Sequence, residues 1–155
     1  QSTIIYLTIY LVMNLGAFAC IFMMKRESIF YENIKDLSGL SKNHPALALS
    51  FLIILFSLAG IPPLAGFFAK FYVFMAVIEA NMYALAIIGL VTTVVSAFYY
   101  LRIIKIIYFD KPNKPFDESY DWGLKSSLIL SSILILTYFI YPSILTNVVY
   151  SIIIY

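Results

Sequence analysis

The stretch that decides the fold is SLAGIPPLAGFFAKFYVF, residues 57–74. It lies inside an apolar run, residues 46–78, in which Lys70 is the only charged residue. As one straight helix this run would be ~50 Å long at ~1.5 Å per residue, whereas the hydrocarbon core of a membrane is ~30 Å thick. We therefore predict that the helix is interrupted.

Two adjacent prolines supply the interruption. Each lacks an N–H group and clashes with the carbonyl four residues earlier, which frees the carbonyls of Leu58 and Ala59. Glycines on both sides permit the sharp turn. We predict one discontinuous membrane span made of two half-helices, 46–59 and 67–78. We assign its break to Gly60, Pro62, Pro63 and Gly66.

The composition indicates an integral membrane protein. Of its 155 residues 63% are hydrophobic and 12% are charged, and the mean hydropathy is +0.95. A water-soluble domain of this size does not carry so much apolar sequence. With one cysteine, Cys20, and one histidine, His44, the sequence contains neither a disulfide framework nor a metal-ligand cluster. The net charge of +2 is too small to indicate nucleic-acid binding.

The predicted fold class is an all-α integral membrane protein, with one membrane domain over residues 1–155. Apolar segments long enough to cross a bilayer alternate with polar loops. We predict four transmembrane spans, at about 4–24, 46–78 (broken at 60–66), 82–107 and 126–146. The polar loops between them are 25–45 and 108–125.

The basic residues predict the orientation. Of the ten Lys and Arg, all except Lys70 lie in or beside the two polar loops: Lys25, Arg26, Lys35, Lys42, Arg102, Lys105, Lys111, Lys114 and Lys125. With four spans both loops fall on one face of the membrane. The positive-inside rule places that face in the matrix or the cytoplasm.

Lys70 is the candidate functional residue. A lysine at membrane depth costs roughly 2.5–3.5 kcal/mol on insertion scales, so a functional reason for keeping it is expected. Desolvation and the positive N-terminal end of the second half-helix favour the neutral amine, while a carboxylate or a chain of waters would favour the ammonium. We predict that Lys70 is a proton relay. The alternative is a structural lysine bound to the freed carbonyls of Leu58 and Ala59.

One lysine cannot carry a proton across ~30 Å of hydrocarbon. Ser57 is a candidate for holding waters on the path, and Glu79 is a candidate group near the outer surface. The alternative for Glu79 is an ordinary solvated carboxylate in a turn. The remaining stations of a proton path are therefore expected outside this sequence, on another chain or on sequence not included here.

Three runs resemble a known family. They are YLVMNLGAFAC, SLAGIPPLAGFFAKFYVF and IEANMYALAIIGLVTTVVSAFYYLRIIKIIYF, and together they cover most of the chain. They are similar to the C-terminal part of NADH dehydrogenase subunit 2, called subunit N in bacteria. These are antiporter-like membrane subunits of respiratory complex I. Mrp-type sodium/proton antiporters share the broken helix.

The resemblance implies a proton-translocating subunit built from inverted helical repeats, with Lys70 as the buried lysine of the broken helix. It implies no cofactor in this chain, because NADH, FMN, iron–sulfur clusters and quinone are handled by other subunits of the NADH:ubiquinone oxidoreductase. The family's earlier helices have no counterpart here. We therefore expect other membrane-arm subunits and the lipid bilayer as partners, including a chain that supplies those helices.

Two alternatives to this function remain open. The chain can instead be a component of an Mrp-type sodium/proton antiporter, or a structural remnant of the membrane arm without a proton path of its own. The abundance of Ile, Phe and Tyr with only two arginines, Arg26 and Arg102, suggests an AT-rich genome. We accordingly expect the mitochondrial inner membrane, with a bacterial plasma membrane as the alternative.

Overall fold

The chain forms a bundle of helices closed at one end by two loops. The computed structural model describes residues 2–27, 29–117 and 121–142. Within them the elements in chain order are α1 (Ser2–Phe22), β1 (Lys25–Arg26), β2 (Ile29–Phe30), the 3-10 helix η1 (Ile34–Leu37), α2 (Leu40–Asn43), α3 (Pro45–Ala59), α4 (Ala65–Glu79), α5 (Tyr83–Phe109) and α6 (Trp122–Ile140).

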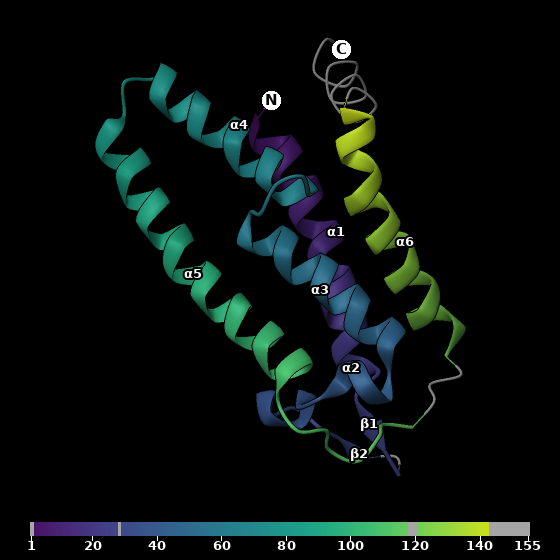
Figure 1. Ribbon diagram of the computed structural model, residues 1–155. Coiled ribbons are helices and arrows are strands. Elements are labelled where there is room, and N and C mark those ends of the chain that lie inside the picture. Colours follow the sequence, from purple (N-terminus) through teal and green to yellow (C-terminus); the bar gives the residue numbers. More distant parts are fainter. Residues whose placement is uncertain (1, 28, 118–120, 143–155) are drawn as a thin grey trace.

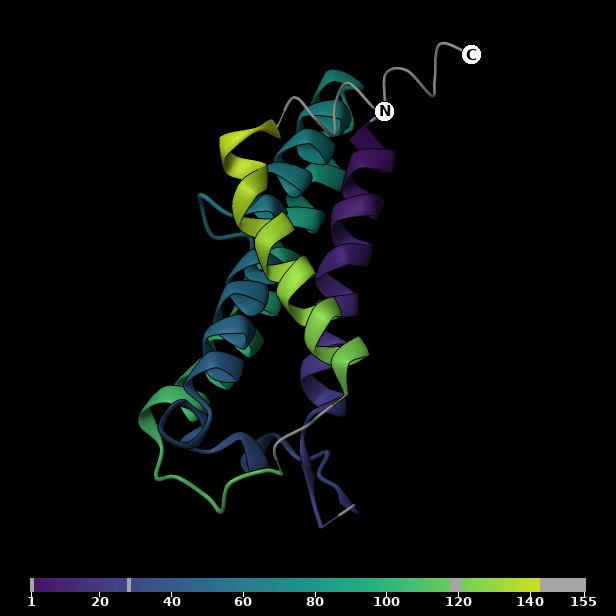
Figure 2. The same cartoon turned by 90° about the vertical axis from the view of Figure 1, so that its right-hand side faces the viewer.

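Helices α3 and α4 occupy the centre of the bundle. Helix α1 packs against both of them and against α6, while α5 packs against α3 and α4. Figure 1 shows α5 on one side of α3 and α6 on the other. Turned by 90°, the bundle shows α1 and α6 separating toward the end at which α1 begins (Figure 2). This arrangement places the facing ends of α3 and α4 among α1, α5 and α6, while Pro62 and Pro63 in the turn between them are exposed.

Small residues let the helices approach closely at the middle of α1. A Cβ atom on Gly16 would lie 2.8 Å from Cδ1 of Ile54 in α3 and 2.9 Å from Cβ of Ser131 in α6. Cys20 and Ala19, one turn further along, are buried. Membrane helices use small residues in this way because apolar side chains gain little by leaving lipid, so close packing must supply the attraction.

Local chemistry sets the helix ends. Pro45 occupies the first position of α3, where its missing N–H leaves no bond unmade. Helix α6 begins at Trp122 and not near 126, because Oδ1 of Asp121 accepts hydrogen bonds from the N–H groups of Gly123 (2.9 Å) and Leu124 (3.4 Å). The predicted end of this last span, near 146, lies outside the described residues.

The two polar loops lie together at one end of the bundle (Figure 1). We call residues 23–27, 29–44 and 110–117 the loop layer. Ser38 Oγ donates to the Lys111 carbonyl (2.7 Å), and the Asn113 N–H donates to the Ser38 carbonyl (3.0 Å). The side-chain amide of Asn113 donates to the Lys35 carbonyl (2.8 Å), and that of Asn43 donates to the Asn113 carbonyl (2.7 Å). Each of these four bonds has a backbone carbonyl as its acceptor, so together they fix the course of the backbone in both loops.

Arg26 fastens the small hairpin β1–β2 to the same layer. Its guanidinium carbon lies 4.6 Å from the ring centroids of both Tyr31 and Phe116, and its Nε donates to the Pro115 carbonyl (3.2 Å). The Phe116 N–H donates to Nε2 of His44 (3.0 Å). The hairpin and these contacts were not predicted from the sequence.

Replacing Arg26 by alanine is expected to destabilise this end of the bundle by roughly 2 kcal/mol. The change removes two cation–π contacts, worth about 0.5–1 kcal/mol each, and one hydrogen bond worth about 1 kcal/mol. Thermal denaturation of the detergent-solubilised protein measures the effect. Arg102→Ala is the matched control, because Arg102 is an exposed arginine on α5. Equal melting temperatures for the two variants would contradict the assignment.

Two helices within the described residues are by themselves long and apolar enough to cross a membrane, α1 and α5. The apolar helix α3 and the Trp122–Tyr138 part of α6 are shorter. The count of four spans, and the joining of α3 and α4 into one span, therefore stay predictions.

Candidate functional site

Gly60 ends helix α3. Its φ of +85° is in the left-handed region that glycine adopts without steric cost. The N–H groups of Gly60 and Ile61 both donate to the Phe56 carbonyl (3.1 and 3.0 Å), as at many glycine-terminated helices. Pro62 and Pro63 then lie in the turn 60–64 that separates α3 from α4.

Ser57 and Gly66 join the two helices across this turn. The hydroxyl oxygen of Ser57, fully buried, accepts from the Gly66 N–H (2.9 Å) and the hydroxyl donates to Sδ of Met13 in α1 (3.0 Å). Gly66 packs directly on α3, since a Cβ atom at this position would collide with the Ser57 carbonyl. Position 66 therefore requires glycine.

Lys70 reaches back from α4 to the end of α3. Its Nζ donates to the Leu58 carbonyl (2.8 Å) and, at 3.4 Å, to the Ala59 carbonyl. These carbonyls belong to the C-terminal end of a helix, which carries partial negative charge and attracts a cation. A Cβ atom on Gly60 would lie 3.2 Å from Cδ of Lys70, so the glycine also leaves room for the lysine. Both predicted freed carbonyls thus have a partner.

Lys70 also lines a polar cavity of about 250 Å³. The cavity lies among α1, α3, α4 and α5. Its lining residues are Tyr6, Tyr10, Met13, Leu58, Gly66, Lys70, Thr92, Thr93, Ser96 and Tyr100. Seven of these ten carry a hydroxyl or an ammonium group. We call it the lysine cavity.

Sequence reasoning missed the hydroxyl groups of this cavity. Thr92, Ser96 and Tyr100 recur every four residues on α5, and Tyr6 and Tyr10 are likewise four apart on α1, with stacked rings 5.8 Å apart. Residues four apart share one face of a helix. The four-residue spacing indicates that these hydroxyl residues share one face of each helix. It does not show that this face turns toward Lys70.

The other predicted path residues lie outside the lining of the lysine cavity. Ser57 is engaged in linking α3, α4 and α1, as described above. Glu79 is the exposed last residue of α4, ~13 Å along the helix from Lys70 at ~1.5 Å per residue. Their roles in a water or proton path stay predictions.

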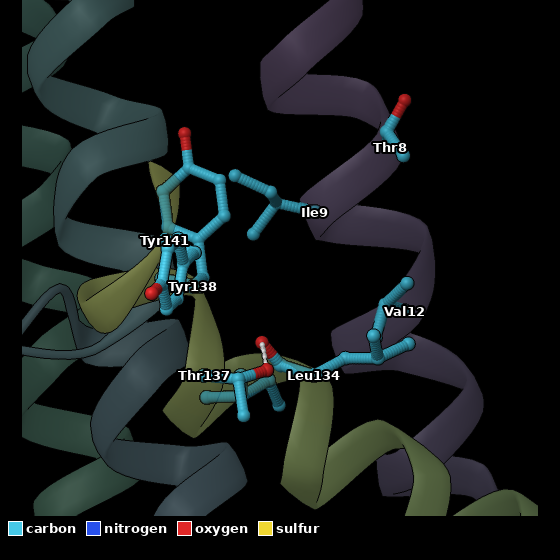
Figure 3. A pocket seen from close by; sticks show the side chains of 9 residues that line it. Thr8, Ile9, Val12, Leu134, Thr137, Tyr138 and Tyr141 are labelled. Atoms are coloured by element: carbon cyan, nitrogen blue, oxygen red, sulfur yellow. Dashed lines mark hydrogen bonds between the residues drawn. The ribbon is translucent and has the colours of Figure 1, made fainter. Parts of the chain in front are cut away.

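A second cavity, of about 350 Å³, lies between α1 and α6 (Figure 3). Ile9 and Val12 line it from α1, with Leu134 and Tyr138 from α6. The Thr137 hydroxyl beside it donates to carbonyls of its own helix. This cavity is apolar, so it offers no route for a charge. Among the described residues no group of three or more His, Cys, Asp and Glu is placed to hold a metal ion.

Replacing Ser57 by alanine is expected to destabilise the break by roughly 1–3 kcal/mol. The buried Gly66 N–H would lose its acceptor, and a buried donor left unpaired costs about 1–3 kcal/mol. Ser57→Thr, which keeps the hydroxyl, is the paired variant. Thermal denaturation of the detergent-solubilised protein compares them, and an alanine variant as stable as the wild type would contradict the role of the hydroxyl.

Comparison with known proteins places the chain in a family. Residues 1–96 match the family described as NADH:quinone oxidoreductase/Mrp antiporter, transmembrane. The chain belongs to this family of membrane proteins.

Its relatives narrow the class further. The chain is 64% identical over 149 residues to NADH-quinone oxidoreductase subunit N of Pelagibacter ubique, and 52% identical over 143 residues to that of Parvibaculum lavamentivorans. These alignments cover 96% and 92% of the chain but 32% and 30% of the relatives. The chain therefore spans about a third of their length. The resemblance to subunit N seen in the sequence is confirmed.

A solved structure supports the same class. The chain is similar to one chain of a structure described as respiratory complex I from Thermus thermophilus with bound aureothin. The TM-score is 0.78 and the identity 31%, over 89% of this chain and 31% of that one. The helical, antiporter-like membrane fold predicted from the sequence is thus confirmed at that level.

Proposed function

We propose that this chain is a proton-translocating part of the membrane arm of respiratory complex I, and that Lys70 is the residue that binds and releases the proton. The observation that carries the proposal is the position of Lys70. Its Nζ is held at the end of α3 and borders the lysine cavity, which is lined by hydroxyl groups. In its charged form Lys70 thus has a hydrogen-bond partner at the end of α3. The lysine cavity beside it is a polar space through which a proton can reach or leave the amine.

The proposed setting is a discontinuous membrane span. Helices α3 and α4, with the turn 60–64, would together cross the bilayer once, alongside spans formed by α1, α5 and α6. Unwound backbone at membrane depth is tolerated where it borders a cavity or is buried in protein. Two hydrogen bonds on either side of this turn support that setting, because Lys70 Nζ donates to the Leu58 carbonyl and the Gly66 N–H donates to Ser57 Oγ.

The redox chemistry is proposed to lie elsewhere in the assembly. The relatives are named as subunits of NADH-quinone oxidoreductase, so the enzyme class belongs to the complex. We expect no cofactor in this chain. Its proposed partners are the other membrane-arm subunits, and helices of the same assembly outside these 155 residues complete the proton route.

The proposed location is an energy-coupling membrane with the loop layer on its cytoplasmic or matrix face. The named relatives are bacterial, which favours a bacterial plasma membrane over the mitochondrial inner membrane. The basic residues of the loop layer favour the inner side.

Two other functions have specific support. The family description includes Mrp antiporters, which leaves a sodium/proton antiporter component as the second candidate. The bonds between Lys70 and the α3 carbonyls are also what a purely structural lysine would make.

Purification and transport together test the proposal. The chain is expected to co-migrate on a native gel with NADH dehydrogenase subunits, and proton uptake into inside-out vesicles is expected to require quinone reduction by NADH. Uptake driven by a sodium gradient without quinone reduction would favour the antiporter. Absence of NADH dehydrogenase subunits from the native band would refute the complex I assignment.

A further inference from the structure

The apolar cavity between α1 and α6 has the shape of a wedge. At its narrow end the two helices touch, because a Cβ atom on Gly16 would lie 2.9 Å from Cβ of Ser131. From this contact the helices separate toward the end at which α1 begins (Figure 2). On α6, Leu134 lines the cavity near the contact and Tyr141 lines it about two turns further along (Figure 3). We call it the wedge cavity.

The wedge cavity is large enough for a ligand but offers little to water. Its volume of about 350 Å³ is within the ~300–1,000 Å³ that is typical of ligand pockets. The Thr8 hydroxyl donates to the Ile4 carbonyl (2.9 Å) and the Thr137 hydroxyl to the Ile133 carbonyl (2.8 Å), so each bonds to its own helix. A bound water needs two to four polar partners, and apolar cavities without them stay dry. The occupant is therefore expected to be mostly apolar.

One buried polar group in the wall indicates that the occupant also carries an acceptor. Tyr138 is 7% exposed, and its ring packs on that of Phe68 in α4 with 5.9 Å between the centroids. The Tyr72 hydroxyl of α4 lies near the Tyr138 hydroxyl, but no described atom is placed to form a hydrogen bond with it. Buried tyrosine hydroxyls usually have a partner. An apolar molecule with a single acceptor oxygen at this depth would supply one.

The position of Tyr138 along α6 indicates the source of that acceptor. Trp122 begins the helix and Tyr141 follows it, both exposed, and they are ~28 Å apart at ~1.5 Å per residue. This span matches the ~30 Å hydrocarbon core, and Trp and Tyr are enriched at both membrane interfaces. Tyr138 therefore lies within about one turn of the membrane face opposite the loop layer. The ester carbonyls of phospholipids lie at this edge of the hydrocarbon.

We propose that the wedge cavity binds one acyl chain of a phospholipid from the leaflet opposite the loop layer, and that the ester carbonyl of this chain accepts a hydrogen bond from Tyr138. This inference rests on the proposed membrane setting of α1 and α6 and is independent of proton exchange at Lys70. A chain of methylenes is thin and flexible enough to reach the narrow end of the wedge, whereas a helix with its side chains is ~10–12 Å across. The chain supplies van der Waals contacts that an unfilled gap between the helices would forfeit.

Photolabelling tests the site in the full complex. Membranes that contain phosphatidylcholine with a diazirine in the middle of one acyl chain are irradiated before or after the complex is purified in mild detergent. Mass spectrometry then identifies the labelled residues. Leu134 and Leu136 are the matched positions, because they are 46% and 45% exposed but Leu136 is not among the residues that line the wedge cavity.

We expect lipid labels at both positions in the membrane and, after purification, severalfold more label on Leu134 than on Leu136. The reason is that detergent replaces lipid on an open helix surface more readily than in the wedge. Equal labels after purification would overturn the lipid site, as would a Leu134 position that receives no label in the membrane. Membership of complex I is decided separately by the native gel, so the proposed function can stand or fall without this site.

Substitutions separate the chain from its ester contact. Val12→Trp fills the wedge cavity from α1, and Leu11→Trp, at an exposed position outside the lining, is its control. Tyr138→Phe removes only the hydroxyl, with Tyr99→Phe on the exposed side of α5 as its control. Val12→Trp and Tyr138→Phe are each expected to lower the retained label on Leu134 severalfold, while the controls leave it unchanged. Undiminished label in Val12→Trp would overturn the chain site, and undiminished label in Tyr138→Phe would overturn the ester contact.

Discussion

Lys70→Arg is expected to leave the membrane assembly intact while stopping proton transfer through this chain. An arginine keeps a permanent cation that can donate to the Leu58 and Ala59 carbonyls, but its guanidinium does not release a proton in proteins. Removing a positioned proton-exchanging group typically slows transfer by about 10²–10⁴-fold. The measurement is the ratio of protons taken up to NADH oxidised in inside-out vesicles.

Lys70→Met is the companion variant, since it removes the cation as well. It leaves two carbonyls at the end of α3 without their donor, at a cost of about 1–3 kcal/mol for each buried group. It should therefore lose both transport and thermal stability, whereas Lys70→Arg loses transport alone. A Lys70→Arg variant with full transport would identify Lys70 as a structural cation and exclude the relay.

Gly66→Ala is expected to be the most damaging substitution for the fold. Even a methyl group at this position meets the carbonyl of Ser57, which is backbone and cannot swing aside. Helix α4 must then move away from α3, which breaks the Gly66–Ser57 hydrogen bond and shifts Lys70 from its carbonyl partners. The expected cost is about 3 kcal/mol or more. Thermal denaturation and the amount of protein accumulated in membranes measure it.

Gly89→Ala is the matched control for that experiment. A Cβ atom at Gly89 would meet only the ring of Phe74, 2.9 Å from Cε1, and an aromatic ring at the helix surface can turn. Alanine also gains up to about 1 kcal/mol of helix propensity over glycine. Wild-type accumulation of both variants would mean that α3 and α4 do not depend on their close approach.

The interruption was predictable from the sequence because it rests on covalent properties. Proline lacks a donor wherever it occurs, and glycine tolerates a positive φ in any surroundings. The two glycines have different tasks, however. Gly60 provides the left-handed turn and the space for Lys70, whereas Gly66 provides contact between helices. The role of Gly66 depends on which part of α3 packs against it, and the sequence alone does not give that contact.

The lysine cavity was not predictable for the same reason. Tyr6 and Tyr10 share a face of α1, and Thr92, Ser96 and Tyr100 share a face of α5, but hydroxyl groups in apolar helices often bond only to their own backbone. Which faces meet is decided by packing around α3 and α4. The hydrogen bonds of the loop layer were not predictable either, because they join residues such as Ser38 and Lys111 that are distant in sequence.

The loop layer also ties the helices together at one end of the bundle. At that end the two loops are bonded to each other and, through the Gly39 N–H and the Ile106 carbonyl (3.1 Å), to α5. At the opposite end the described residues provide only the short turn 80–82 between α4 and α5 (Figure 1). The lysine cavity therefore lies between two helices, α1 and α5, whose ends at the loop layer are tied together by backbone hydrogen bonds.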